Sequence, residues 1–277
     1  MSFTKMHGLG NDYLFIEGER YPDRDWPELS RRMSERHLGA GADGIILILP
    51  SETAAFRMRI FNADGSEAET CGNGIRCFAK YVYERGMTHE TEFVIDTLGG
   101  PNRVTLNTEG GRVVSVRSNM GRPRFDRAEI PMEGPSGRVI EEPLALENGE
   151  TLRITCANIG NPHAAAFVDD ATLVDLAAVG PKVERHPRFP QRTNVEFVTV
   201  LDRGNIVMRI WERGSGVTMA SGSGSCGAAL ASMITGRVDR RVHVHLRYGK
   251  LAITWAEDGC VYQEGPATEV YAGVWPE

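Results

Sequence analysis

Two glycine-punctuated turns are the segments of this chain best suited to chemistry, because each begins with a side chain that can carry a proton. The first is Cys71–Gly74 and the second is Ser221–Gly224. An apolar stretch follows each turn and ends at Gly86 or Gly236, where glycine suits the position after a helix. The first N–H groups of a helix lack partners within it and carry the positive end of its dipole. Each turn therefore predicts a binding site for an anion such as a carboxylate.

Cys71 stands where a helix dipole would act on its thiol. Such a position lowers a thiol pKa from about 8.5 toward neutrality, and the thiolate can then serve as base or nucleophile. Position alone also fits a small buried residue in a turn. Cys77 and Cys226 fall inside the expected helices and are typical of core residues, whereas Cys156 and Cys260 lie in strand-like contexts without an evident partner.

Other chemistries fit the sequence less well. Gly8–Gly10 and Gly39–Gly41 lack the glycine spacing of nucleotide-binding loops, and no Walker-type lysine follows them. A hydrolytic triad would pair His163 with a serine of the second turn, but the GxSxG elbow is absent. His243 and His245 share one face of a predicted strand, with no acidic or thiol partner near them in sequence, so we expect no metal site.

The elements that must position these turns occur twice. Met58–Asn62 corresponds to Met208–Glu212, and the turn follows at the same distance in both halves. A strand, a loop, the turn and an apolar helix thus recur at one constant offset. This repetition indicates a duplication, and it predicts two similar domains with a cleft between them.

Strands are expected to outnumber helices. No series of strands alternating with crossover helices is present, which disfavours a doubly wound sheet and favours an α+β fold. The segments that alternate as strands do are Phe56–Ile60, Val113–Arg117 and Val242–Leu246. The helical patterns are Trp26–Glu35, Ile75–Glu84 and Cys226–Thr235.

Composition narrows the class of protein. The 277 residues are 41% apolar and 25% charged, as in a globular protein, and no run suggests a membrane span or a secretion signal. A net charge of -6 argues against nucleic-acid binding. The five cysteines fit neither a disulfide framework nor a paired zinc site. We therefore expect a cytoplasmic enzyme or binding protein without membrane or nucleic-acid partners.

Seven short segments resemble, in order, the motifs of the diaminopimelate epimerases, and together they span nearly the whole chain. The segments are Lys5–Asp12, Arg36–Gly44, Asn62–Glu67, Cys71–Cys77, Gly160–His163, Thr193–Phe197 and Trp211–Gly216.

This resemblance implies an α+β fold of two pseudo-symmetric domains, each a mostly antiparallel sheet wrapped around a central helix, with the active site in the cleft between them. The N-terminal domain would comprise residues 1–117 plus 266–277, and the C-terminal domain residues 118–265. The implied reaction converts LL-2,6-diaminopimelate to the meso isomer, for lysine and peptidoglycan precursor synthesis. One thiolate removes the Cα proton and a thiol on the opposite face delivers another, without pyridoxal phosphate, metal or other cofactor. Members are usually cytoplasmic homodimers.

Site residues carry over motif by motif. The first catalytic cysteine is Cys71, and His163 resembles a supporting residue near the reacting centre. The residues that resemble those binding the distal end of the diamino acid are Asn11, Asn62, Asn161, Asn194 and Arg213. The remaining substrate-contacting set is Glu212, Gly72, Asn73, Gly222 and Ser223. Asparagine also favours turns, which is the alternative role for the four asparagines.

The important departure from the family pattern is Ser221, which occupies the position of the second catalytic cysteine, while Cys226 matches a later, non-catalytic one. A hydroxyl is a much weaker acid than a thiol, and a general acid–base group typically contributes about 10²–10⁴-fold in rate. Three explanations stay open: an engineered substitution that traps a ligand, a natural enzyme that turns over slowly or through a water or hydroxyl relay, and divergence toward one-base chemistry on a different amino acid. A catalytically dead protein that binds a diamino acid is the non-enzymatic alternative.

Overall fold

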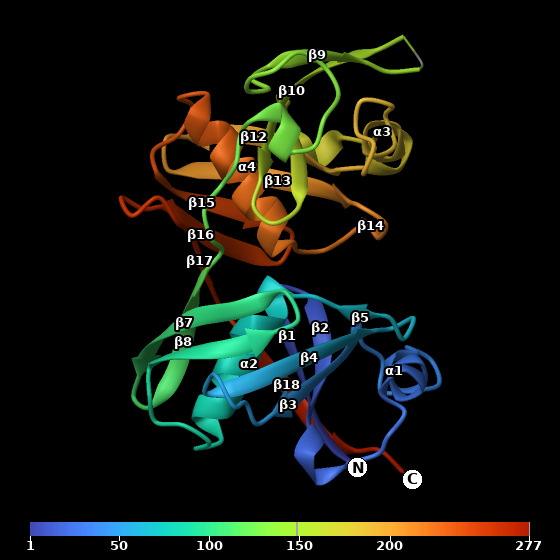
Figure 1. Ribbon diagram of the computed structural model, residues 1–277, viewed down its shortest axis with the longest axis vertical. Coiled ribbons are helices and arrows are strands. Elements are labelled where there is room, and N and C mark those ends of the chain that lie inside the picture. Colours follow the sequence, from blue (N-terminus) through green and yellow to red (C-terminus); the bar gives the residue numbers. More distant parts are fainter. Residues whose placement is uncertain (148, 277) are drawn as a thin grey trace. The chain divides into compact units, whose positions relative to one another are not determined.

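Each of two units of the chain is built around one helix of 13 residues, α2 (Gly72–Glu84) in the first and α4 (Gly222–Ile234) in the second. The computed structural model describes residues 1–147 and 149–276 (Figure 1). The first unit comprises Met1–Asn119 and Glu264–Glu277, and the second comprises Met120–Gln263. The chain therefore leaves the first unit and returns to it at its C-terminal end.

In the first unit, strands flank α2 in the hydrogen-bonded order β18-β1-β2-β3-β4-β6-β7-β8, with β5 paired to β4. Only β2–β3 and β4–β6 are parallel among these pairs of described strands. The strands are β1 (Ser2–Gly8), β2 (Asn11–Glu17), β3 (Gly44–Leu49), β4 (Phe56–Asn62), β5 (Glu67–Ala68), β6 (Glu92–Thr97), β7 (Gly100–Glu109), β8 (Arg112–Asn119) and β18 (Thr268–Val274). The other helices are η1 (Gly18–Arg20) and α1 (Trp26–Ser34).

The second unit has the hydrogen-bonded order β9-β10-β11-β12-β13-β15-β16, with β14 paired to β13. The strands from β9 on are β9 (Glu142–Ala145), β10 (Thr151–Asn158), β11 (Pro162–Phe167), β12 (Asn194–Asp202), β13 (Asn205–Glu212), β14 (Gly216–Val217), β15 (Arg241–Leu246), β16 (Gly249–Trp255) and β17 (Val261–Gly265). The remaining helices are η2 (Arg127–Glu129), η3 (Ala171–Leu173) and α3 (Leu176–Glu184). Within the described residues, no helix is both long and apolar enough to cross a membrane.

Strand register repeats between the units at one offset. Ile45 pairs with Leu14 and Phe61 in the first unit, and Val195 pairs with Ala164 and Trp211 in the second. Each position differs by 150 from its counterpart, as do the bounds of α2 and α4. The expected α+β class, dominated by strands, is confirmed, and the repeat visible in the sequence is a repeat of backbone structure.

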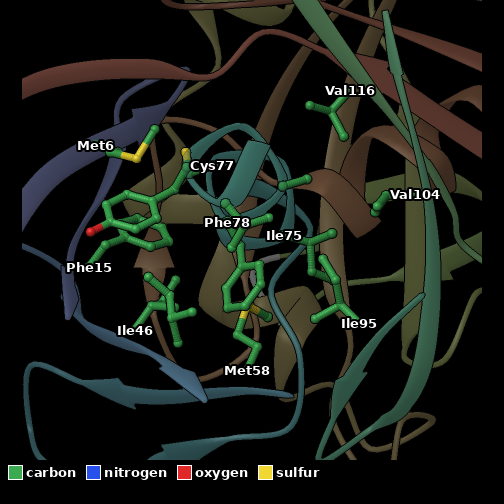
Figure 2. Close-up of a cluster of buried hydrophobic side chains, with 14 of the residues drawn as sticks. Met6, Phe15, Ile46, Met58, Ile75, Cys77, Phe78, Ile95, Val104 and Val116 are labelled. Atoms are coloured by element: carbon green, nitrogen blue, oxygen red, sulfur yellow. The ribbon is translucent and has the colours of Figure 1, made fainter. Parts of the chain in front are cut away.

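The two central helices are buried by different means. In the first unit, Ile75, Phe78 and Val82 follow helical spacing and point into a cluster with strand residues such as Ile46 and Met58 (Figure 2). In the second unit, α4 consists largely of buried glycine, alanine and serine. Its small side chains let the surrounding strands come close to the helix backbone.

We expect Phe78→Ala to lower the free energy of unfolding by about 3–5 kcal/mol, because it leaves a cavity in the centre of the first unit's core. Phe78 is 0% exposed, whereas Leu98, on the same unit, is 61% exposed and provides the control. Leu98→Ala should change stability by less than about 0.5 kcal/mol. Urea denaturation of both variants checks this, and equal stability losses would contradict it.

Candidate active site

Cys71 and Ser221 are the N-caps of α2 and α4, as the glycine turns predicted. Both have extended backbones, with φ -148° and ψ 111° for Cys71 and φ -129° and ψ 122° for Ser221. Cys71 Sγ accepts the Gly74 N–H at 3.3 Å, and Ser221 Oγ accepts the Gly224 N–H at 3.1 Å. The two starts are therefore the same capping structure carrying a thiol in one unit and a hydroxyl in the other.

Glycine allows close packing in both caps. A Cβ on Gly74 would lie 2.6 Å from Ile46 Cδ1, and a Cβ on Gly224 would lie 2.3 Å from Ile210 Cδ1. A side chain at either position would therefore push the tip of the facing isoleucine aside. The absence of a side chain keeps the capping N–H groups close to the strands.

Five of the predicted site residues belong to the first unit, and four of them gather at the α2 start. Cys71 donates its S–H to Asn11 Oδ1 at 3.5 Å, and Asn73 Nδ2 donates to the same oxygen at 3.2 Å. Gly72 is the first residue of the helix. Asn62 is different, because its side-chain amide donates to Ser66 Oγ at 3.0 Å within its own turn.

The expectation of a lowered pKa for the Cys71 thiol is wrong. Burial raises this pKa above its usual value, and it outweighs the hydrogen bond from Tyr13, the backbone N–H groups of Gly74 and Asn73 and the positive charge of Arg76, all of which lower it. The helix start therefore acts in the expected direction, but desolvation of the thiolate is the larger effect. Only a folded structure shows how much water the thiol loses.

In the second unit, Ser221 lies against the carboxyl group of Glu212. The Ser221 hydroxyl is hydrogen-bonded to this carboxyl, which also accepts a hydrogen bond from Thr218 Oγ1. Burial raises the pKa of Glu212, although the Thr218 and Ser221 hydroxyls and the nearby His163 act against the shift. The hydroxyl thus has an adjoining group that can take up or supply a proton.

A second buried network lies on β11 and β12. His163 Nδ1 is 2.6 Å from Glu196 Oε1, and His163 Nε2 is 2.8 Å from Asn161 Oδ1. Asn161 Nδ2 in turn donates to Ser223 Oγ at 3.4 Å. Sequence reasoning missed Glu196, which is 0% exposed and whose pKa is raised by burial. A carboxylate among the apolar residues of a buried strand was the available signal.

Asn194, Arg213 and Gly222 occupy structural positions around these networks. The Asn194 side chain donates to Pro162 O at 2.8 Å and accepts the Arg213 N–H at 2.9 Å, which fixes the turn after β13. The exposed Arg213 guanidinium donates to Gln191 O at 3.2 Å. A Cβ on Gly222 would lie 2.5 Å from Gln263 Oε1, so the glutamine side chain packs directly against this position.

No group of three His, Cys, Asp or Glu side chains among the described residues is placed to hold a metal ion. Of the two histidines on β15, His245 has its Nε2 2.9 Å from the side-chain oxygen of Asn205.

Comparison with known proteins places the fold and the family. The family model for diaminopimelate epimerase matches residues 3–125 and 155–270. The diaminopimelate epimerase of Moorella thermoacetica is 53% identical, and the match covers 100% of this chain and 99% of that one. That of Geobacillus kaustophilus is 47% identical over 99% of this chain and 96% of its own.

Solved structures with much lower identity share the fold. A phenazine biosynthesis protein of the PhzF family from Bacillus anthracis has a TM-score of 0.69 at 16% identity, covering 99% of this chain and 98% of that one. A hydroxyproline epimerase from Agrobacterium vitis has a TM-score of 0.65 at 16% identity, covering 99% and 91%. These structures define a wider class of proteins that share this overall fold. Within it, the chain belongs to the diaminopimelate epimerase family.

The rate of alkylation should differ among the cysteines according to how deeply each is buried. Cys71 is partly exposed, whereas Cys77, Cys156 and Cys226 are buried, and burial raises the pKa of Cys77 to about 12. We expect iodoacetamide to modify Cys71 well before those three, at a rate that rises with pH, because a raised pKa leaves little thiolate near neutrality. Mass mapping of peptides checks this, with the partly exposed Cys260 as reference. Equal labelling of all five cysteines would contradict it.

Proposed function

We propose that this chain binds LL-2,6-diaminopimelate and exchanges the proton on one Cα, as a cofactor-independent epimerase that forms the meso isomer. The observation that carries the proposal is the pair of equivalent helix caps, one with a thiol and one with a hydroxyl beside a carboxyl group. Membership of the diaminopimelate epimerase family supports the substrate.

The N-terminal ends of α2 and α4 would bind the reacting carboxylate of the substrate. The N–H groups at the beginning of α2 and α4 favour an anion, and the glycines let it approach the backbone. Asn11, Asn161 and Arg213 provide amide and guanidinium groups suited to the charged distal end. Asn62 and Asn194 complete the proposed binding set, and Asn194 acts through the Arg213 turn that it holds.

Proton transfer would be unequal on the two sides. As thiolate, Cys71 can remove a Cα proton; the Ser221 hydroxyl can donate one to the resulting carbanion, and Glu212 can then restore the hydroxyl proton. In the opposite direction Ser221 would have to act as base, and a hydroxyl ionises far less readily than a thiol. We therefore expect slow epimerisation with Cys71 as the competent base.

Ser221→Cys should raise the rate of isomer interconversion by about 10²-fold or more, the usual contribution of a positioned acid–base group. Serine and cysteine differ by one atom, so the cap and the binding groups stay in place and substrate affinity should change little. Chiral chromatography of the diaminopimelate isomers measures the rate, and calorimetry measures the binding.

Ser232→Cys is the matched control, because Ser232 is a buried serine farther along the same helix. It should leave the rate unchanged. A serine form that is already fast, with Ser221→Cys neutral or harmful, would favour one-base chemistry on a different amino acid. Binding without any proton exchange in either form would favour a diamino-acid binding protein.

We also propose a cytoplasmic homodimer, as the family resemblance implies. The edge strand β18 exposes Val270, Tyr271 and Val274, at 50%, 39% and 75%, and a second copy could cover these apolar side chains. Sedimentation equilibrium of the purified chain would test the dimer, and a monomer at micromolar concentration would overturn it.

A further inference from the structure

Arg76 is a fully buried cation on the helix that carries Cys71. Its side chain is 0% exposed, although an arginine keeps its charge at every ordinary pH. The guanidinium donates to Gly72 O at 3.2 Å, to Asn73 Oδ1 at 2.7 Å and to Pro266 O at 3.1 Å. Burying a charge is costly, so this position calls for a role beyond filling space.

Arg76 determines which way the neighbouring amides point. A guanidinium only donates hydrogen bonds, so Asn73 must present its oxygen to Arg76 and its nitrogen to Asn11 Oδ1. At the other end, Asp43 Oδ2 accepts from Asn11 Nδ2 at 2.7 Å. A donor-only group and an acceptor thus fix both amides, and Asn11 Oδ1 faces the Cys71 thiol.

Arg76 also acts on the thiol by its charge. Burial raises the pKa of Cys71, and the Arg76 charge is one of the influences that lower it. The other titratable groups close to the thiol are the hydroxyl of Tyr13 on β2 and the thiol of Cys77 on α2, with the Asp43 carboxyl behind Asn11. Arg76 is the only cation in this set of described groups.

The second unit differs at this point. The counterpart of Arg76 at the constant offset of 150 is Cys226, a neutral buried residue. Instead of a cation behind the cap, a carboxyl group lies against the Ser221 hydroxyl. The two caps share a backbone, but a cation lies behind the first, and a carboxyl group whose pKa is raised by burial lies beside the second.

We propose that Arg76 is a positioning residue for Cys71, whose buried charge favours the thiolate and whose hydrogen bonds orient the Asn73–Asn11 amide pair against it. This assigns a role to a residue outside the proposed substrate-binding set. It concerns the ionisation of one thiol, so it does not depend on which amino acid the chain acts on.

The experiment is the pH profile of iodoacetamide modification at Cys71, followed by mass mapping in the full chain. Arg76→Met should slow modification at pH 8 by about three- to tenfold, since loss of the charge raises the pKa of the thiol and lowers the thiolate fraction, while the greater nucleophilicity of the remaining thiolate offsets part of this. Arg76→Lys keeps the charge and should stay within about twofold of the unaltered chain.

Arg127→Met is the matched control, because Arg127 is also buried, at 4% exposed, but belongs to the second unit. It should leave the Cys71 profile unchanged. The buried Cys77 and Cys156 report unfolding, since they become modified only if the chain opens.

Two results would overturn the proposal. One is an Arg76→Met profile equal to the unaltered one, or no slower than that of Arg127→Met, while the buried cysteines stay protected. The other result can be obtained even if Arg76→Met unfolds. If a folded Arg76→Lys variant is modified at Cys71 tenfold more slowly or worse, the charge does not set the reactivity of Cys71.

Discussion

The N–H groups at the first turns of α2 and α4, which no carbonyl of the same helix can accept, are the constraint on which the rest of this structure depends. Glycines lie in both turns, and the tips of Ile46 and Ile210 on the neighbouring strands pack closely against Gly74 and Gly224. The caps, Cys71 and Ser221, accept one of these donors and stand beside the others. The proposed anion binding and the placement of a proton carrier would both come from this piece of backbone, which is built twice.

Duplication preserved this backbone while the side chains beside it diverged. At the constant offset, Arg76 corresponds to Cys226 and Asn62 to Glu212. The first cap has a buried cation behind it, and the second has a carboxyl group against it. In the proposed mechanism, the Arg76 charge favours the thiolate of Cys71, and the raised pKa of Glu212 favours a bound proton beside Ser221, which would divide the roles of base and proton donor between the two caps. A serine at position 221 makes that division steeper, because its hydroxyl gives up a proton less readily than a thiol.

The sequence predicted those features that local patterns determine. Glycine spacing and the repeat indicated both helix starts and the α+β class, since caps and periodicity are properties of neighbouring residues. It did not predict the raised pKa of Cys71, the contact between Ser221 and Glu212, or the pairing of His163 with Glu196. These depend on desolvation and on side-chain contacts that only the folded backbone brings about. Asn62, chosen by motif, donates its side-chain amide to Ser66 within its own turn, a contact that the motif did not indicate.

The proposed epimerisation depends on Cys71 as the single competent base. The direct measurement is deuterium incorporation at Cα in deuterated water, with LL- and meso-diaminopimelate supplied in separate reactions. Mass spectrometry gives the deuterium content, and isomer analysis gives the extent of inversion. One of the two isomers presents its Cα proton to Cys71. This isomer should gain deuterium several times faster than it inverts, because the thiol returns a solvent deuteron more readily than Ser221 donates one. Cys71→Ser should abolish the exchange. Exchange that persists in Cys71→Ser, or exchange of both isomers at the rate of their interconversion, would contradict the claim.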